Sequence, residues 1–444
     1  MKIGFYIGLF CCCLPVWATA QFDAGKLNEL LQSYHDNQKV MMGICLSQNG
    51  NPVYTRNVGY ADVEYKIESD SNTRYHIGSI SKMFTAVLIY QLVEEGKLHM
   101  DTRLSQFFPE VTNSQRIHIS LLLQHRSGLV NFTNDSSYLH YMELPHTRRQ
   151  LLDRFAQSPS AFEPDTKAAY SNTNYILLSM IIEKICDSSY DEVLQQRICK
   201  RIGLRNTRVA TIINTQDHEA QSYDFRSDRW VTSTQTHMSV PLGAGAIEST
   251  PQDLCRFIEQ LFSGKLIQDS TLQSMIKIRD HYGSGILQFP YNERKAYGHS
   301  GGIDGFQGML IYLPETSLAV AITGNAWNYP MNSVAIAAMN IYFGLPFIQP
   351  SFQKHIIEYT DPHRPEGSYR NDKVDKVMKI SKQGETLMAQ ALGQAAFPLQ
   401  QKENQTYVFE AANIEIVFQQ DKEGNYTGFQ LKQGQMDVWF EREK

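Results

Sequence analysis

Ser79 and Lys82, three positions apart, are the residues of this sequence whose types and spacing most directly suggest a catalytic reaction. They stand at the head of an apolar run, Met83 to Val93, that ends at Glu94-Glu95-Gly96. The helical spacing of the apolar side chains and the terminal glycine predict a buried helix. Ser79 would then lie in or beside the first helical turn, with Lys82 facing the same way.

A serine and a lysine in this position could form a nucleophile and its base. A helix start offers free backbone N–H groups and a partial positive charge, and both stabilise a developing oxyanion. Burial among apolar groups pushes a lysine toward its neutral form, which can take the proton of a hydroxyl group. The sequence therefore predicts an activated Ser79 with Lys82 as its base.

The Ser-x-x-Lys pattern recurs, however, at Ser274–Lys277 and at Ser351–Lys354. At ordinary residue frequencies, a chain of this length holds about two such matches by chance. The pattern alone does not distinguish a catalytic serine from a coincidence, so the surrounding motifs have to decide.

A second stretch, Tyr170-Ser171-Asn172, directly precedes a helix expected from about Thr173. A phenol at such a turn can project into a cleft, and the Asn172 amide can orient a neighbouring group. The same residues could simply be a helix cap after an aromatic residue, and Tyr369-Arg370-Asn371 fits the same loose pattern.

A third stretch, Gly298-His299-Ser300-Gly301-Gly302, stands just before an expected hairpin strand. Its glycines would let a substrate lie close against a strand edge. A tight turn with an exposed histidine would have the same residue types, and two other His-x-Gly matches begin at His76 and His281.

Taken together and in this order, the three stretches resemble the serine β-lactamase and penicillin-binding superfamily. The resemblance is to its class C-like branch, which includes D-Ala-D-Ala carboxypeptidases, D-aminopeptidases and related esterases, and it covers about residues 25–345. Leu122–Leu129, Gly243–Asp253 and Gly298–Phe306 also look like this family.

The resemblance implies a role for each matching residue. Ser79 would become acylated, while Lys82 and Tyr170 would share the proton as base and then acid. Asn172 would hold Lys82 or the substrate amide, and the N–H groups of Ser79 and Gly302 would form an oxyanion hole. The substrate would also be bound along His299, Ser300 and Gly301, and hydrolysis would need neither a metal nor an organic cofactor.

His299 departs from the pattern of dedicated β-lactamases, which usually carry a lysine there to hold the substrate carboxylate. A histidine with an unperturbed pKa is only partly charged near neutrality, so it would hold a carboxylate less well. We therefore expect a hydrolase of D-amino-acid peptides or esters. A modest β-lactamase and a non-catalytic penicillin- or peptidoglycan-binding sensor are the alternatives.

Composition limits the partners and the compartment. The 444 residues are 42% hydrophobic and 20% charged with a net charge of −5, which is ordinary for a globular protein and argues against nucleic acid as the main partner. Residues 1–20 have the pattern of a secretory signal, which predicts an exported, periplasmic or secreted chain without a membrane segment in its mature form. The expected partner is a small-molecule or peptide substrate, including peptidoglycan fragments. Of seven cysteines, Cys45, Cys186, Cys199 and Cys255 would remain, and we expect mostly buried free thiols.

The order of the patterns predicts an α+β fold in two domains. Strand pairs at both ends of residues 21–345 bracket a mainly helical region of about 101–263. This arrangement favours one antiparallel sheet flanked by terminal helices, with an inserted helical domain, as in the β-lactamase and transpeptidase fold. A proline-rich linker would cover residues 346–366, and short alternating segments predict a small antiparallel β-barrel or sandwich over 367–444.

Overall fold

The computed structural model describes residues 22–350, 352, 365–372, 376–383, 386–391, 396–403, 405–409, 414–433 and 436–443. The predicted signal at residues 1–20, much of the linker predicted at 346–366, and Ser351 and Lys354 lie outside the described residues.

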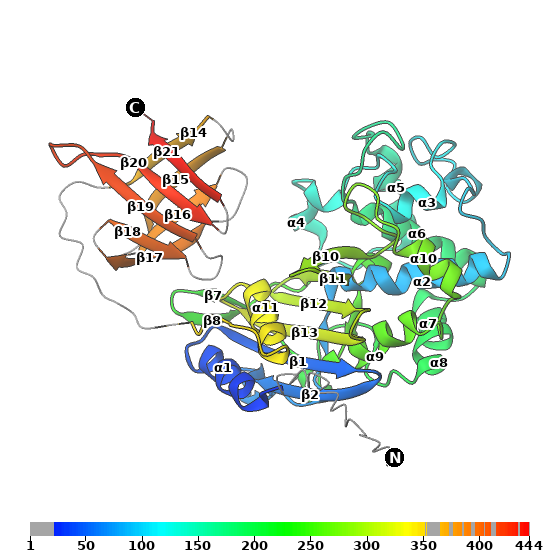
Figure 1. The fold of residues 1–444 in the computed structure, drawn as a ribbon. Helices are drawn as coiled ribbons and strands as arrows, with labels where there is room; N and C mark the ends of the chain where they lie inside the picture. The colour runs from blue at the N-terminus through cyan, green and yellow to red at the C-terminus, as the bar shows by residue number, and fades with distance from the viewer. Residues whose placement is uncertain are drawn as a thin grey trace, which may run out of the picture.

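A single antiparallel sheet joins the two ends of the first domain, as predicted (Figure 1). The N-terminal hairpin pairs with the C-terminal hairpin through β1 and β13, in a register that sets Cys45 opposite Ala321. The main path runs in the order β10 (Leu287–Tyr291), β11 (Arg294–Ile303), β12 (Phe306–Leu313), β13 (Leu318–Trp327), β1 (Val40–Gln48) and β2 (Asn51–Val58).

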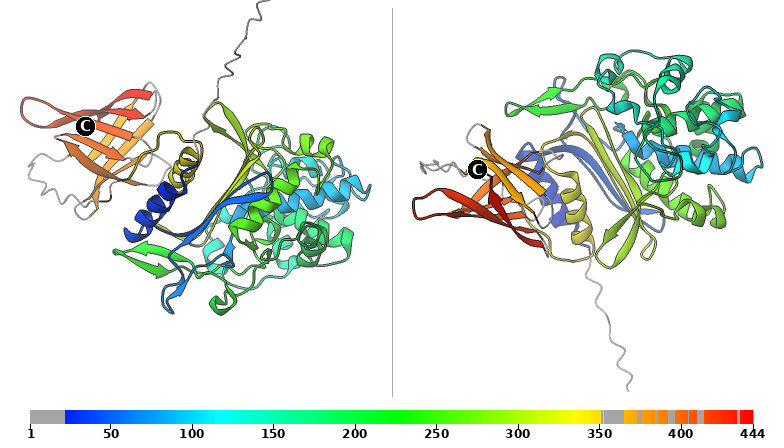
Figure 2. Two further views of the ribbon diagram at one scale, coloured as in Figure 1. Left: turned by 60° about the horizontal axis from the view of Figure 1, so that its bottom comes forward. Right: turned by 90° about the horizontal axis from the view of Figure 1, so that it is seen from above.

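Helices cover both faces of this sheet. The terminal helices α1 (Ala24–Asp36) and α11 (Met331–Tyr342) pack together on one face, and the helical region covers the other (Figure 2). Strand β1 is therefore buried along nearly its whole length, since neither face is left to water. The first of these terminal helices, α1, is amphipathic, with Leu27, Leu30, Leu31 and Tyr34 as its buried face.

The helix predicted after Ser79 is α2, Ser81–Glu94, and every residue from Ser81 to Leu92 is buried. Apolar side chains on all sides leave this helix no solvated face, so it lies inside the protein. The other helices of the inserted region are α3 (Ile119–Leu123), α4 (Tyr138–Tyr141), α5 (Arg148–Gln157), α6 (Asn172–Cys186), α7 (Tyr190–Leu194), α8 (Lys200–Ile202), α9 (Pro251–Phe262) and α10 (Asp269–Met275).

The first domain also contains short strands that the sequence pattern did not predict. Strand β7 (Tyr223–Arg226) joins the main sheet off its main path, through a parallel pairing of Tyr223 with Ala326 near the end of β13, and forms a hairpin with β8 (Arg229–Thr232). Strands β5 (Tyr75–His76), β9 (Ile247–Ser249) and β6 (Arg208–Val209) form a separate three-stranded sheet. Segments of two to four residues are too short to show an alternating pattern, so only long-range pairing reveals them.

The C-terminal domain is a closed barrel, which decides between the two expected forms. Aromatic and aliphatic side chains fill its interior, and β14 pairs with β21 to close the ring of strands. Its strands are β14 (Gly367–Asn371), β15 (Lys376–Gln383), β16 (Thr386–Ala391), β17 (Phe397–Glu403), β18 (Thr406–Phe409), β19 (Ile414–Gln420), β20 (Tyr426–Gln433) and β21 (Met436–Arg442).

Two expectations about the chain as a whole can be compared with the structure. The four cysteines are free thiols, and Cys45, Cys199 and Cys255 are buried. Across the described ranges, none of the helices combines the length and the apolar character needed to span a bilayer.

Candidate active site

Ser79 lies in a 3₁₀ turn, Gly78–Ile80, that leads directly into α2. Gly78 has a positive φ of 49°, and a Cβ at this position would lie 2.7 Å from the backbone nitrogen of Gly302. Only glycine allows this close approach in this conformation, so the turn that presents Ser79 lies against the edge of β11.

Two side chains contact the Ser79 hydroxyl, as the resemblance implied. Lys82 Nζ lies 3.0 Å from Ser79 Oγ, and the Tyr170 hydroxyl donates to the same oxygen over 2.6 Å. Lys82 comes from the first turn of α2, and Tyr170 from the segment before α6. The structure thus brings Tyr170 to a pair of residues that stand about ninety positions before it in the chain.

Lys82 is fully buried, and burial holds the pKa of its amine well below the ordinary value of 10.5. Besides Ser79, its Nζ contacts Asn172 Oδ1 at 2.8 Å and the Ala244 carbonyl at 2.7 Å. A neutral amine has two N–H donors and one lone pair. Two carbonyl oxygens and one hydroxyl group match that set, so the lone pair faces the Ser79 proton.

Tyr170 is a proton donor in the resting site. Burial raises the pKa of its phenol above the ordinary value, and the hydrogen bond to Ser79 lowers it only in part. The expectation that Lys82 and Tyr170 share the basic role therefore sharpens into two roles. The lowered pKa suits Lys82 to accept a proton, whereas Tyr170 keeps its proton and could pass it to a leaving group.

The Asn172 amide is held in one orientation. Its Oδ1 accepts from Lys82, and its Nδ2 donates to Thr133 Oγ1 at 3.3 Å. Its backbone N–H also donates to Asn131 Oδ1 over 2.9 Å. Of the two roles implied for Asn172, these contacts show the one of holding Lys82.

Strand β11 passes close to the backbone of the Ser79 turn. A Cβ at Gly301 would lie 2.0 Å from the Ile77 carbonyl oxygen and 3.0 Å from the Ser79 nitrogen. Next to it, Gly302 lines the same cavity as Ser79. These glycines bring the backbone of β11 and of the Ser79 turn together, which is the arrangement that an oxyanion hole requires.

His299 lies three residues before Gly302 on β11 and is buried, with 3% of its surface exposed. Burial and the nearby Lys82 lower its pKa to about 4. The expectation of a partly charged histidine therefore needs correction, because this imidazole is neutral near pH 7. Its ring centroid lies 6.4 Å from that of Tyr170, and its Nδ1 is 2.5 Å from the Ser300 carbonyl oxygen. Ser300 itself is half-buried on β11 opposite Met309.

Sequence reasoning missed His125 as a residue that positions Tyr170. The imidazole packs on the Tyr170 ring with 4.5 Å between ring centroids, and its Nδ1 accepts from the Ser171 N–H over 3.1 Å. Burial, together with Lys82 and His299, holds its pKa well below 6.5. In the sequence, His125 belongs to the stretch Leu122–Leu129, and no local feature distinguishes it from an ordinary residue at the end of a helix.

A cavity of about 310 Å³ opens over Ser79. Its walls are Gly78, Ser79, Phe132, Thr133, Tyr138, Met142, Asn172, Thr236, Pro241, Ala244, Gly245, Gly302, Ile303 and Asp304. A second cavity of about 620 Å³ reaches Tyr170, and Phe132 lines both. Tyr170 and His299 are not among the walls of the first cavity, so the site has two distinct sides.

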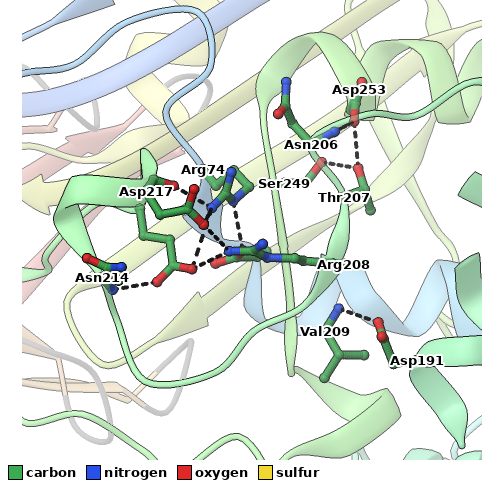
Figure 3. A network of polar contacts seen from close by, with 12 residues as sticks. Arg74, Asp191, Asn206, Thr207, Arg208, Val209, Asn214, Asp217, Ser249 and Asp253 are labelled. Carbon is green, nitrogen blue, oxygen red and sulfur yellow. Dashed lines mark hydrogen bonds and ion pairs between the residues drawn. The ribbon is translucent and has the colours of Figure 1, made fainter.

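A partly buried ionic network joins the strands of the small three-stranded sheet (Figure 3). Arg74 donates to Glu248 at 2.8 Å and Arg208 donates to the same carboxylate at 2.6 Å, which ties the starts of β5 and β6 to β9. The Ile77 N–H then donates to the Ile247 carbonyl over 2.9 Å. Because Ala244 lies three residues before β9, this network supports the segment whose carbonyl holds Lys82.

Within the described part of the chain, no group of three or more His, Cys, Asp or Glu side chains is arranged to hold a metal ion.

Comparison with known proteins identifies the family. The Beta-lactamase family model matches residues 27–341, so the chain belongs to this family. It is a serine hydrolase of the β-lactamase and penicillin-binding superfamily, as predicted.

Relatives and solved structures agree with this assignment. Penicillin-binding protein 4* of Bacillus subtilis strain 168 is 26% identical over 88% of this chain and 93% of its own length. Teichoic acid D-alanine hydrolase of Staphylococcus aureus strain MRSA252 is 25% identical over 60% of this chain and 64% of its own length. The structure of D-amino acid amidase from Ochrobactrum anthropi SV3 matches with a TM-score of 0.63 and 25% identity over 71% of this chain and 98% of that one.

One solved structure resembles both domains. The octameric penicillin-binding protein homologue from Pyrococcus abyssi covers 94% of this chain and 100% of its own, with a TM-score of 0.67 and 23% identity. This likeness concerns the fold.

Proposed function

We propose that this chain hydrolyses D-amino-acid peptides or esters through an acyl-enzyme on Ser79. The observation that carries the proposal is the convergence of Lys82 Nζ and the Tyr170 hydroxyl on Ser79 Oγ, at 3.0 and 2.6 Å. A binding protein without catalysis has no use for a neutral buried amine and a protonated phenol on the same hydroxyl group, which disfavours the sensor alternative.

The proton path follows from the two pKa shifts. Neutral Lys82 takes the Ser79 proton as Oγ attacks the substrate carbonyl, and the resulting oxyanion meets the N–H groups of Ser79 and Gly302. The bond to the leaving group then breaks as Tyr170 donates its proton, and the Lys82 ammonium returns a proton to Tyr170. Water finally attacks the acyl ester, releases the acid and restores Ser79.

The names of the relatives support a D-amino-acid substrate. One is called a teichoic acid D-alanine hydrolase and another a D-amino acid amidase; the first is similar to this chain in sequence and the second in structure. The neutral His299 also lacks the fixed cation that would hold the carboxylate of a penicillin. These points favour the D-amino-acid reading over a β-lactamase.

Covalent labelling tests the nucleophile. A fluorophosphonate or a fluorescent penicillin should modify the wild-type chain once, as read by intact mass and peptide mapping to Ser79. Ser79→Ala should not be labelled, whereas Ser274→Ala, which removes the exposed serine of the other described Ser-x-x-Lys match, should be labelled normally. Stoichiometric labelling of a folded Ser79→Ala variant would exclude the assignment.

Turnover distinguishes the alternatives. Wild type should hydrolyse a D-alanyl ester or amide faster than nitrocefin. Stable labelling with no turnover of any of these compounds would favour the sensor, and efficient nitrocefin hydrolysis would favour the β-lactamase. Export also stays a proposal, supported by the pattern of residues 1–20, and a mature N-terminus at Gln21 after secretion would test it.

A further inference from the structure

Asp304 is an acidic residue in the cavity that holds Ser79, and the proposed reaction gives it no role. It lies two residues after Gly302, in the turn between β11 and β12, and lines the cavity together with Ser79, Gly302 and Ile303. Among the described residues that form these walls, it is the only one with a formal charge.

The Asp304 carboxylate is held in place by neutral donors. Its Oδ1 accepts from Thr236 Oγ1 at 2.6 Å, and its two oxygens lie 3.2 and 3.1 Å from the Thr236 N–H. Thr236 is itself buried and lines the cavity. Its two donors orient the carboxylate and leave its charge uncompensated.

No lysine, arginine or histidine of the described residues forms an ion pair with Asp304. Burial raises the pKa of Asp304 above its ordinary value; the hydrogen bonds from Thr236 oppose this shift, and the acidic charges of Asp224 and Glu143 add to it. A half-buried carboxylate with acidic neighbours is costly unless a cation reaches it. The missing cation would have to come from a bound molecule.

The side of the site on which Asp304 lies identifies the part of the substrate that it meets. Tyr170 must give its proton to the leaving group, so the leaving group lies on the Tyr170 side. That side includes His299 and the second cavity. Asp304 lies at the opposite end, beyond Gly302, and along a strand His299 and Gly302 are roughly 10 Å apart. The retained acyl group therefore extends toward Asp304.

From this geometry we infer that Asp304 is a subsite for a primary ammonium on the acyl group, so that the substrates are D-aminoacyl esters or amides with a free α-amino group. The inference rests on the proposed acyl-enzyme and narrows its substrate class. Peptides whose D-residue is already acylated on nitrogen should be poor substrates, because they have no ammonium group to place beside Asp304.

A matched pair of substrates tests the inference. D-alanine p-nitroanilide and N-acetyl-D-alanine p-nitroanilide share the leaving group and differ in the charge on nitrogen. Wild type should prefer the free amine in kcat/KM by roughly ten- to hundredfold, the size expected for a hydrogen bond between charged groups. In Asp304→Asn this preference should fall to about one, mainly through KM, because ground state and transition state lose the same contact.

Asp304→Asn keeps an acceptor for Thr236, so the turn should fold as in wild type. The rate on the N-acetyl substrate serves as an internal control and should change by less than about threefold. Asp224→Asn removes the same charge from a residue outside the cavity walls and should keep most of the preference.

The outcomes separate this inference from the proposed function. A wild-type enzyme that is labelled on Ser79 but treats both substrates alike, or cleaves neither, overturns the Asp304 subsite and leaves the acyl-enzyme intact. An undiminished preference in Asp304→Asn, or an equal loss in Asp224→Asn, also overturns it. Absence of labelling on Ser79 instead refutes the proposed function.

Discussion

Replacing Lys82 with methionine tests the central element of the site. Methionine has nearly the same length and is apolar, so it can fill the buried space of the lysine stem while removing the only base on Ser79. The lysine is fully buried and contacts Ser79, Asn172 and Ala244. Everything that holds Ser79 in its turn, including Gly78 and the edge of β11, stays in place.

The expected effect on rate is large and the effect on stability is small. A positioned general base contributes about 10²- to 10⁴-fold, so acylation should slow by this factor. The substitution leaves the Asn172 and Ala244 oxygens without their donor, at a cost of about 1–3 kcal/mol each. Removing an amine that is costly to bury offsets this loss, so the free energy of unfolding should change by about 2 kcal/mol or less.

The measurement is the rate of covalent labelling by a fluorophosphonate as a function of pH. In wild type the rate should fall as the pH drops through the pKa of Lys82, because only the neutral amine accepts the serine proton; burial places that limb well below pH 10.5. In Lys82→Met the limb should vanish along with most of the rate. Lys97→Met, the same change at an exposed lysine, should leave both unchanged. A Lys82→Met variant that labels within about threefold of wild type, with its pH limb retained, would show that another group is the base.

Two more substitutions test the packing around the site. Gly301→Ala places a methyl group 2.0 Å from the Ile77 carbonyl oxygen and should push β11 away from the Ser79 turn. The loss of one oxyanion donor in this way lowers kcat by about 10²- to 10³-fold. A folded variant with wild-type kinetics would contradict the close approach of the two backbones. His76→Leu removes a buried imidazole whose two nitrogens have no hydrogen-bond partner among the described residues and whose pKa burial lowers to about 4. His76 binds its proton near pH 6.5 in the unfolded chain and only near pH 4 in the folded one. The free energy of unfolding of wild type therefore falls by about 1.4 kcal/mol per pH unit as the pH drops from about 6.5 toward 4, and that of the variant does not. In urea unfolding, the free energy of unfolding of His76→Leu relative to wild type should therefore be higher at pH 5 than at pH 7. An equal difference between the two proteins at both pH values would contradict a neutral buried His76.

Much of the fold could be predicted because its signals are local. The apolar run after Ser79 predicted α2, and alternating hairpins at both ends of the first domain predicted a shared sheet, which β1 and β13 form. The short strands β6, β7 and β9 escaped prediction because two to four residues carry no period. The sequence also could not distinguish a barrel from a sandwich, because closure of the barrel depends on the long-range pairing of β14 with β21.

The other described Ser-x-x-Lys match shows what local sequence leaves open. Ser274 and Lys277 are exposed at the end of α10, and the Ser274 hydroxyl donates to the Ser270 carbonyl one turn earlier in the same helix. The two tetrads contain the same residue types at the same spacing. Only one has Tyr170, Asn172 and the Ala244 carbonyl around it, and those groups come from more than ninety residues downstream.

The sequence by itself determined which residues could react, because a serine and a lysine at a helix start, a Tyr-x-Asn before a helix and a glycine-rich strand are local features. Tertiary structure alone decided their protonation and the shape of the site. The lowered pKa values of Lys82 and His299 come from burial by segments distant in the chain, and a pKa depends on all of these neighbours at once. The placement of Asp304 in the cavity of Ser79 has the same origin, since it depends on β11 lying against the turn before α2.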